Sequence, residues 1–309
     1  MSREQLEAVN RMRRERSGAL APSDGDGEGA AGLAARRRRF AESQFGWPRP
    51  VGTTTREGTL GGVPVVHVGV ADVAVSDDVI LYFHGGGYAL GSAATEVGLP
   101  AYLAQQTGAQ VVSVEYRLAP EHPYPAAVQD AIAAYQGLLA AGHEPGQVAF
   151  AGASAGGGLV VAAQLAAQAA GLPQPAAGVA FSPWADLTLA GASMASKAEF
   201  DVSLTPEMLK AMAPQYAGNH DPADGRVSPI FADLRGLPPL LIQAGSYEIL
   251  LDDATRLAAR AAADEVDVRL EVTARAPHVF QTDWSELDEG RDALISAGAF
   301  LRRYFSATG

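Results

Sequence analysis

The chain has 309 residues, of which 48% are hydrophobic and 19% are charged, proportions typical of a globular protein with a hydrophobic core. Its formal net charge of -12 argues against nucleic acid as a partner, because phosphates require a basic face. The sequence has no cysteine, which excludes disulfides, thiolate nucleophiles and thiolate metal ligands. It has no run of 18 apolar residues and no apolar leader, so we expect no membrane span and a cytoplasmic location. The six histidines lack the close spacing of a metal pair, and neither a metal nor another cofactor is expected.

Residues 1–50 are predicted to form helices that contribute to a cap. Residues 2–17 are polar but place Leu6, Val9 and Met12 at the spacing of one helical face. The basic run 36–39 is interpreted as the solvated face of a second short helix rather than as a binding patch, because the whole chain is acidic.

Residues 51–309 are predicted to form one catalytic domain, in which short β-branched segments alternate with alanine-rich helical segments. Strands are expected at 63–70, 79–83, 111–114, 148–151, 177–181, 239–244 and 268–272. Helices are expected at about 94–107, 125–141, 157–170, 251–264 and 288–305. Continuous apolar strands separated by helices indicate a mostly parallel, doubly wound α/β sheet that is covered on both faces.

The interval between Ser182 and Leu237 has no strong strand pattern. Residues 205–217 favour a helix, with Thr205 as its N-cap before Pro206. Insertions of this length in α/β enzymes usually roof the site. A helical cap insertion is therefore predicted at about 188–225, completed by the N-terminal helices.

Ser154 is the candidate nucleophile. It is the centre of Gly152-Ala153-Ser154-Ala155-Gly156, which directly follows one predicted strand and opens a predicted helix. This arrangement is the nucleophile elbow, in which a sharp turn needs glycine two residues before and two residues after the serine. The alternative, a serine that merely caps a glycine-rich helix, would require no further glycine loop.

A second glycine-rich loop does occur, directly after the predicted strand 79–83. His84 is followed by Gly85, Gly86 and Gly87, and glycines at such a strand end let backbone amides approach a substrate oxygen closely. The loop lies about 70 residues before Ser154, in the order that an oxyanion hole and a nucleophile elbow require. His84 is predicted to pin this loop by hydrogen bonding.

The motifs HGGG, EYRLAPEHPYPAA, GASAGG, SPWADL and PHVF occur in this order over about residues 60–305. In this respect the chain resembles the hormone-sensitive-lipase-like family of bacterial carboxylesterases. The resemblance implies an α/β-hydrolase fold with a helical cap, and an oxyanion hole formed by amides of the Gly85–Gly87 loop and of Ala155. The family usually has Asp or Glu where this chain has Ala153.

His278 and Glu248 are the candidate base and acid, because the triad of this fold runs Ser, acid, His along the chain. His278 lies in the loop after the last predicted strand, whereas His220 lies in a turn-like stretch of the cap and is expected at the surface. The resemblance places Glu248 on the acid position of a Gly-x-x-Asp-x-Leu motif, in register with Gly245 and Leu250. Asp252 and Asp253 are alternatives, although their position favours helix N-terminal carboxylates.

These residues predict a serine carboxylesterase for small to medium acyl esters, which acts through an acyl-enzyme on Ser154. A lactone hydrolase with the same triad is the near alternative, and a non-hydrolytic lyase, cyclase or ligand-binding protein of the same fold ranks below both. Tyr88 and Trp184 are candidate pocket walls, with core packing as the alternative for each. The contact of Arg275, with an anionic substrate or with solvent, is left open, as is a homodimer through the last strand and helix.

Overall fold

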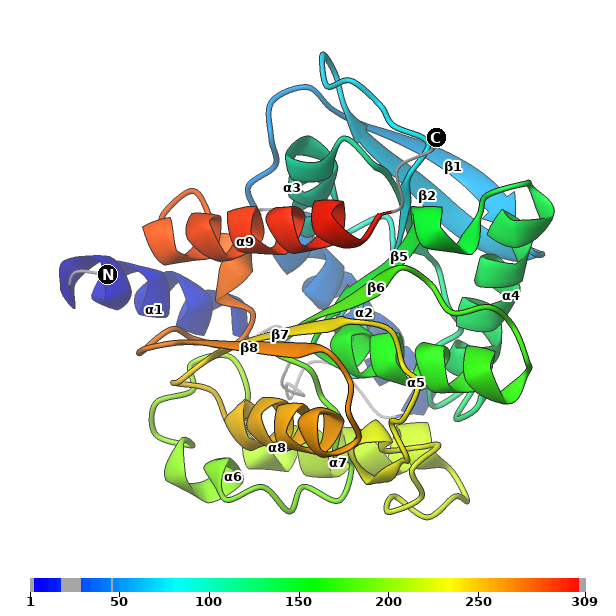
Figure 1. Ribbon diagram of the computed structural model, residues 1–309. Coiled ribbons are helices and arrows are strands. Elements are labelled where there is room, and N and C mark those ends of the chain that lie inside the picture. Colours follow the sequence, from blue (N-terminus) through cyan, green and yellow to red (C-terminus); the bar gives the residue numbers. More distant parts are fainter. Residues whose placement is uncertain (1–2, 18–28, 46, 306–309) are drawn as a thin grey trace.

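The computed structural model describes residues 3–17, 29–45 and 47–305. An eight-stranded sheet runs through the domain in the order β1-β2-β4-β3-β5-β6-β7-β8 (Figure 1). Its strands are β1 (Thr53–Leu60), β2 (Val63–Val70), β3 (Val79–Phe83), β4 (Gln110–Val114), β5 (Val148–Ala153), β6 (Ala177–Phe181), β7 (Leu240–Gly245) and β8 (Val268–Thr273). All neighbours from β4 to β8 are parallel, whereas β2 is antiparallel to both β1 and β4. The predicted mostly parallel α/β sheet is confirmed.

Helices cover both faces of the sheet. Figure 1 shows α3 (Gly98–Thr107) and α9 (Asp288–Tyr304) on one face, and α4 (Ala126–Ala140), α5 (Ala155–Ala169) and α8 (Leu251–Ala263) on the other. Successive residues of a strand point to opposite faces, so Leu81 and Phe83 join one hydrophobic core while Ile80 and Tyr82 join the other. Each central strand is therefore apolar along its whole length, which explains why the sequence pattern predicted them.

The first strand has no counterpart in the sequence prediction. β1 is polar and mostly exposed, so neither apolar alternation nor a buried run marks it. It pairs with β2 across a two-residue turn of Gly61 and Gly62, with φ of 59° and 83°. Positive φ at both positions is what a tight hairpin turn requires, and the glycine pair was the available signal.

The N-terminal helices and the interval after β6 supply the remaining helical elements. These are α1 (Arg3–Ser17), α2 (Gly29–Phe45), α6 (Ser193–Ser196) and α7 (Pro206–Ala217). Short 3-10 turns lie before β5 (Pro145–Gln147), before β7 (Pro229–Phe231) and after β8 (Phe280–Asp283). As predicted, Thr205 caps α7, and its side chain accepts a hydrogen bond from the Met208 amide at 3.3 Å. Within the described residues, no helix combines the length and the apolar character needed to cross a bilayer.

Candidate active site

Ser154 lies at the sharp turn between β5 and α5, with φ of 56° and ψ of -119°. A Cβ on Gly156 would lie 2.0 Å from the Phe83 carbonyl oxygen, and a Cβ on Gly152 would lie 2.4 Å from the Gly156 carbonyl oxygen. Both distances are far shorter than any contact that a real Cβ makes. The chain therefore needs glycine on both sides of Ser154 to let the strand, the turn and β3 approach this closely.

A chain of hydrogen bonds joins Ser154 to His278 and Glu248. His278 Nε2 lies 3.0 Å from Ser154 Oγ, and His278 Nδ1 lies 2.6 Å from Glu248 Oε2. The second oxygen of Glu248, Oε1, accepts a hydrogen bond from the Gly245 amide at 2.9 Å. Burial raises the pKa of Glu248, while hydrogen bonds with His278 and Ser182 oppose the shift. The geometry suits a carboxylate that orients an imidazole toward a hydroxyl.

The alternative acids lie in other contacts. Asp252 Oδ2 accepts a hydrogen bond from the Ser193 amide at 3.0 Å, and Asp253 Oδ2 accepts from the amides of Ala185 and Asp186 at 2.9 and 2.8 Å. Burial raises the pKa of Asp253 to about 8. Both side chains therefore tie the start of α8 to the segment that follows β6.

Two glycines of the loop after β3 line the cavity beside Ser154. Gly86 and Gly87 have φ of 113° and 63°, which glycine adopts most readily, and both line the same cavity as Ser154. Ala155 is the first residue of α5, where an amide has no partner within its helix. Gly85 differs from the prediction, because its amide donates to Glu96 Oε2 at 2.8 Å. Its N–H is thus engaged and unavailable to a substrate oxygen.

Glu96 is a buried carboxyl group that the sequence reasoning missed. Its Oε2 accepts from the Gly85 amide and its Oε1 accepts from the Tyr82 hydroxyl at 2.5 Å. Burial raises the pKa of Glu96 to about 7, although both hydrogen bonds oppose the shift. A lone Glu in the segment after the glycine loop gives no pattern that would have identified it.

The His84 side chain supports the same loop. Its Nδ1 lies 2.8 Å from the Gly85 carbonyl oxygen, and its ring stacks on Tyr116 with 4.2 Å between the ring centroids. Burial lowers the pKa of His84 to about 4, so the ring is neutral near pH 7. This position agrees with the predicted pinning of the loop.

A mostly apolar cavity opens beside Ser154 and His278, with an empty volume of about 870 Å³ that includes open solvent. Its walls come from α1, α2, α7, the glycine loop and the loop of His278. They consist of Arg13, Phe40, Ser43, Gln44, Trp47, Gly85, Gly86, Gly87, Glu96, Ala153, Ser154, Ser203, Leu204, Met208, Leu209, Met212, His278 and Val279. In the described parts of the chain, no cluster of three or more His, Asp and Glu side chains is placed to hold a metal ion.

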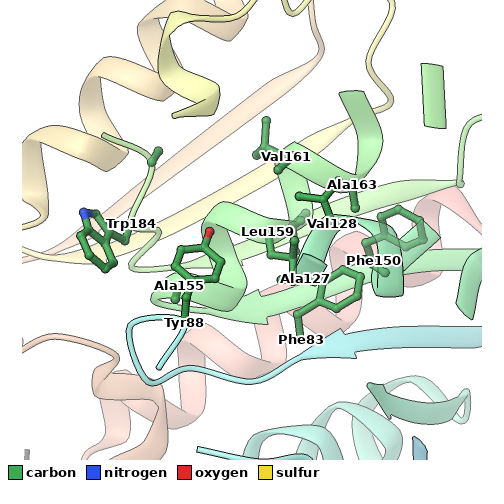
Figure 2. Packing of buried hydrophobic residues seen from close by; sticks show 14 of the residues in the cluster. Phe83, Tyr88, Ala127, Val128, Phe150, Ala155, Leu159, Val161, Ala163 and Trp184 are labelled. Atoms are coloured by element: carbon green, nitrogen blue, oxygen red, sulfur yellow. The ribbon is translucent and has the colours of Figure 1, made fainter. Parts of the chain in front are cut away.

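Both predicted pocket residues lie in the core instead. Figure 2 shows Tyr88 and Trp184 near each other, and their ring centroids lie 6.1 Å apart. Both side chains are fully buried, and neither lines the cavity. Tyr88 stacks on Tyr216 of α7 at 3.7 Å. The prediction was wrong because a position next to a glycine loop or a strand end does not fix which way an aromatic side chain points. Arg275 and His220 are exposed, and neither lines the cavity.

Comparison with known proteins identifies the family. A profile of the α/β-hydrolase fold matches residues 80–282. An acetyl-hydrolase of Streptomyces hygroscopicus is 47% identical over 230 residues, covering 74% of this chain and 76% of the relative. The putative acetyl-hydrolase LipR of Mycobacterium tuberculosis is 36% identical over 271 residues, covering 88% and 87%. A crystal structure of an esterase from the bacterial hormone-sensitive lipase family has 40% identity and a TM-score of 0.91, covering 99% of this chain and 100% of its own. The protein therefore belongs to the α/β-hydrolase fold family and, within it, to the hormone-sensitive-lipase-like esterases.

Proposed function

We propose that the protein is a carboxylic ester hydrolase with Ser154 as nucleophile, His278 as base and Glu248 as the acid that orients it. The observation that carries the proposal is the unbroken chain of hydrogen bonds from Glu248 to Ser154 at the wall of an apolar cavity. The esterase and acetyl-hydrolase names of the relatives support the same activity.

The roles follow from the positions of the atoms. As Ser154 Oγ attacks the ester carbonyl carbon, its proton passes to His278 Nε2, and Glu248 stabilises the imidazolium that forms. The amides of Gly86, Gly87 and Ala155 are the proposed donors to the oxyanion. His278 then protonates the leaving alcohol, and water repeats the sequence on the acyl-enzyme to release the acid.

The cavity supports small to medium acyl esters as substrates. Its apolar walls come from Phe40 and Trp47, and from the α7 side chains Met208, Leu209 and Met212. We propose that the described parts of residues 1–50, together with residues at about 188–225, form the cap of the domain 51–309, because both segments supply these walls. Residues 1–2, 18–28, 46 and 306–309 of these ranges lie outside the described residues. Apolar walls favour acyl chains, and the two methionines can adapt to chains of different length.

A p-nitrophenyl ester series of increasing acyl length, run on wild type and Ser154→Ala, tests this proposal. Wild type is expected to hydrolyse the short and medium esters, and Ser154→Ala is expected to lose at least about 10⁴-fold in kcat. Labelling with an organophosphate should add one group, on Ser154. No turnover of any ester, or labelling at another residue, would refute the proposed function.

Lactones are the second substrate class to test. A cyclic ester presents the same carbonyl, but the three relatives named above are acetyl-hydrolases and an esterase, and none of these three is named a lactone hydrolase. We therefore place open-chain esters first. A lactone panel in the same assay, with kcat/KM above that of the best open-chain ester, would reverse the order.

A homodimer and a cytoplasmic location stay proposals. β8 is an edge strand on which Leu270 and Val272 are 38% and 44% exposed, and Ile295 on the neighbouring α9 is 43% exposed. An unpaired edge with exposed apolar side chains can pair with a second copy. Sedimentation of wild type and Leu270→Lys tests this, because a dimer through β8 should dissociate in the variant.

A further inference from the structure

The residue after His278 has a strained backbone. Val279 has φ of 49° and ψ of 47°, in the left-handed region that a β-branched residue enters only when its surroundings impose it. This turn leads the chain from the loop of residues 274–279, called the base loop below, into the 3-10 turn Phe280–Asp283. Groups that hold the Val279 backbone therefore also hold the imidazole of His278.

A single side chain from the N-terminal helix holds both peptide carbonyls at this point. Arg13 of α1 donates from Nη1 to the His278 carbonyl oxygen and from Nη2 to the Val279 carbonyl oxygen, the latter at 2.9 Å. These contacts join residues 265 and 266 positions apart in the chain. Arg13 is only 8% exposed, although it belongs to a helix that is otherwise largely polar.

The rest of the guanidinium is also fully engaged. Its Nε donates to Asp283 Oδ2 at 2.6 Å, and further bonds reach Thr282 Oγ1 at 2.9 Å and Ser203 Oγ at 3.1 Å. No donor of Arg13 is therefore left for a substrate, even though the residue lines the cavity. Its contacts are with the base loop, with the 3-10 turn that follows this loop and with Ser203.

Ser182 completes the support from the other side of Val279. Its Oγ accepts a hydrogen bond from the Val279 amide at 3.0 Å, so the strained residue is held at its N–H and at its carbonyl. Only a planar fork of donors can serve two consecutive carbonyls and a carboxylate at once. A lysine ammonium at position 13 is a point charge and could not span them.

We propose that Arg13 is a positioning residue for the reaction, which fixes the His278–Val279 backbone so that the imidazole lies between Ser154 and Glu248. The inference rests on the proposed role of His278 as base. It makes α1 part of the machinery that aligns the base, beyond its place in the cavity wall. Ser154 and the glycine loop keep their own supports and do not depend on Arg13.

The test compares two variants in the full-length protein, because removing Arg13 alone would take a positive charge away from the buried Asp283 carboxylate. Asp283→Asn provides the background, and Arg13→Met is added to it. Adding Arg13→Met is expected to lower kcat for p-nitrophenyl butyrate by about 10- to 100-fold and to change KM by less than about threefold, because small displacements of a reacting group are costly. The rate of organophosphate attack on Ser154 should fall in parallel.

Arg11→Met is the matched control, because Arg11 lies on the same helix and is exposed. It should keep wild-type kcat. Circular dichroism below the melting transition ensures that all rates refer to folded protein. Arg13→Lys gives a second measurement if the double variant does not fold: it keeps a positive charge beside Asp283 but cannot serve both carbonyls, and its kcat should fall at least about fivefold.

Wild-type kcat in folded Arg13→Lys, or equal kcat in Asp283→Asn with and without Arg13→Met, would overturn the proposal. A lower melting temperature with unchanged kcat would also overturn the proposal, because it would show a purely structural role. Failure of the proposed function is distinguishable, since wild type would then hydrolyse no ester, or His278→Asn and Ser154→Ala would keep esterase activity whatever Arg13 does.

Discussion

The turn that carries Ser154 and the base loop that carries His278 place their catalytic candidates in different ways. The turn at residues 152–156 is a local device, in which two glycines permit the close approach of β5, α5 and β3. The base loop is held by side chains from distant segments, namely Arg13 from α1 and Ser182 from the end of β6. The glycines of the turn can be recognised in the sequence, whereas supporting contacts from distant segments cannot.

Glu248→Gln has the largest expected effect, and it acts through His278. The amide cannot stabilise an imidazolium and favours the wrong tautomer of His278, so kcat should fall by roughly 10³- to 10⁴-fold, equivalent to about 4–5.5 kcal/mol. Asp252→Asn is the control, because that carboxylate bonds Ser193 instead. Steady-state kinetics decide the matter: near-normal activity in Glu248→Gln would move the acid to another carboxylate.

Gly156→Ala tests whether backbone atoms around the Ser154 turn exclude a Cβ at position 156. The new Cβ would meet the carbonyl oxygens of Phe83 and His84 at 2.0 and 2.6 Å, and backbone atoms cannot rotate away as a side chain can. We expect a loss of about 3 kcal/mol or more in the free energy of unfolding, measured by urea titration. Gly69→Ala is the control, because its Cβ has only an ordinary contact at 3.4 Å with Thr54. Equal stability of the two variants would contradict the packing argument.

Glu96→Gln tests the support of the glycine loop. The Gly85 amide of this loop donates to Glu96, which lies 11 positions further along the chain. The pKa of Glu96 is raised to about 7 in the folded protein from an ordinary 4.5. The folded state therefore binds this proton more tightly, and the resulting stabilisation is complete below pH 4.5 and lost as the pH rises to about 7.

Across this interval wild type should lose up to about 3 kcal/mol of unfolding free energy relative to Glu96→Gln, which does not titrate. Urea denaturation of both proteins at several pH values between 4.5 and 8 measures the difference. A constant difference over this range would show that Glu96 does not change its protonation state there.

Ser182→Ala has the smallest expected effect and tests how much the Ser182 hydroxyl supports the base loop. It removes the acceptor of the Val279 amide and a hydrogen bond to Glu248, leaving a buried N–H unsatisfied. We expect a loss of about 1–2 kcal/mol in unfolding free energy and a decrease of roughly tenfold in kcat. Ser182→Thr, which keeps the hydroxyl, is the matched variant. Unchanged kcat in Ser182→Ala would leave Arg13 as the main support of Val279.

The sheet, the order of the motifs and the residues Ser154, Glu248 and His278 could be predicted from the amino-acid sequence alone. Apolar strands buried on both faces, glycines at the turn and the glycine loop, and the order Ser154, Glu248, His278 are all properties of short segments. The polar β1 was missed because an exposed edge strand needs no apolar pattern.

The groups that surround these three residues follow from the tertiary structure. It placed Tyr88 and Trp184 in the core, engaged the Gly85 amide with Glu96, and brought Arg13 to the carbonyls of His278 and Val279. The direction of a side chain, and its contact with a residue hundreds of positions away, depend on how the helices and strands pack. The spacing of residues along the chain carries no record of such contacts.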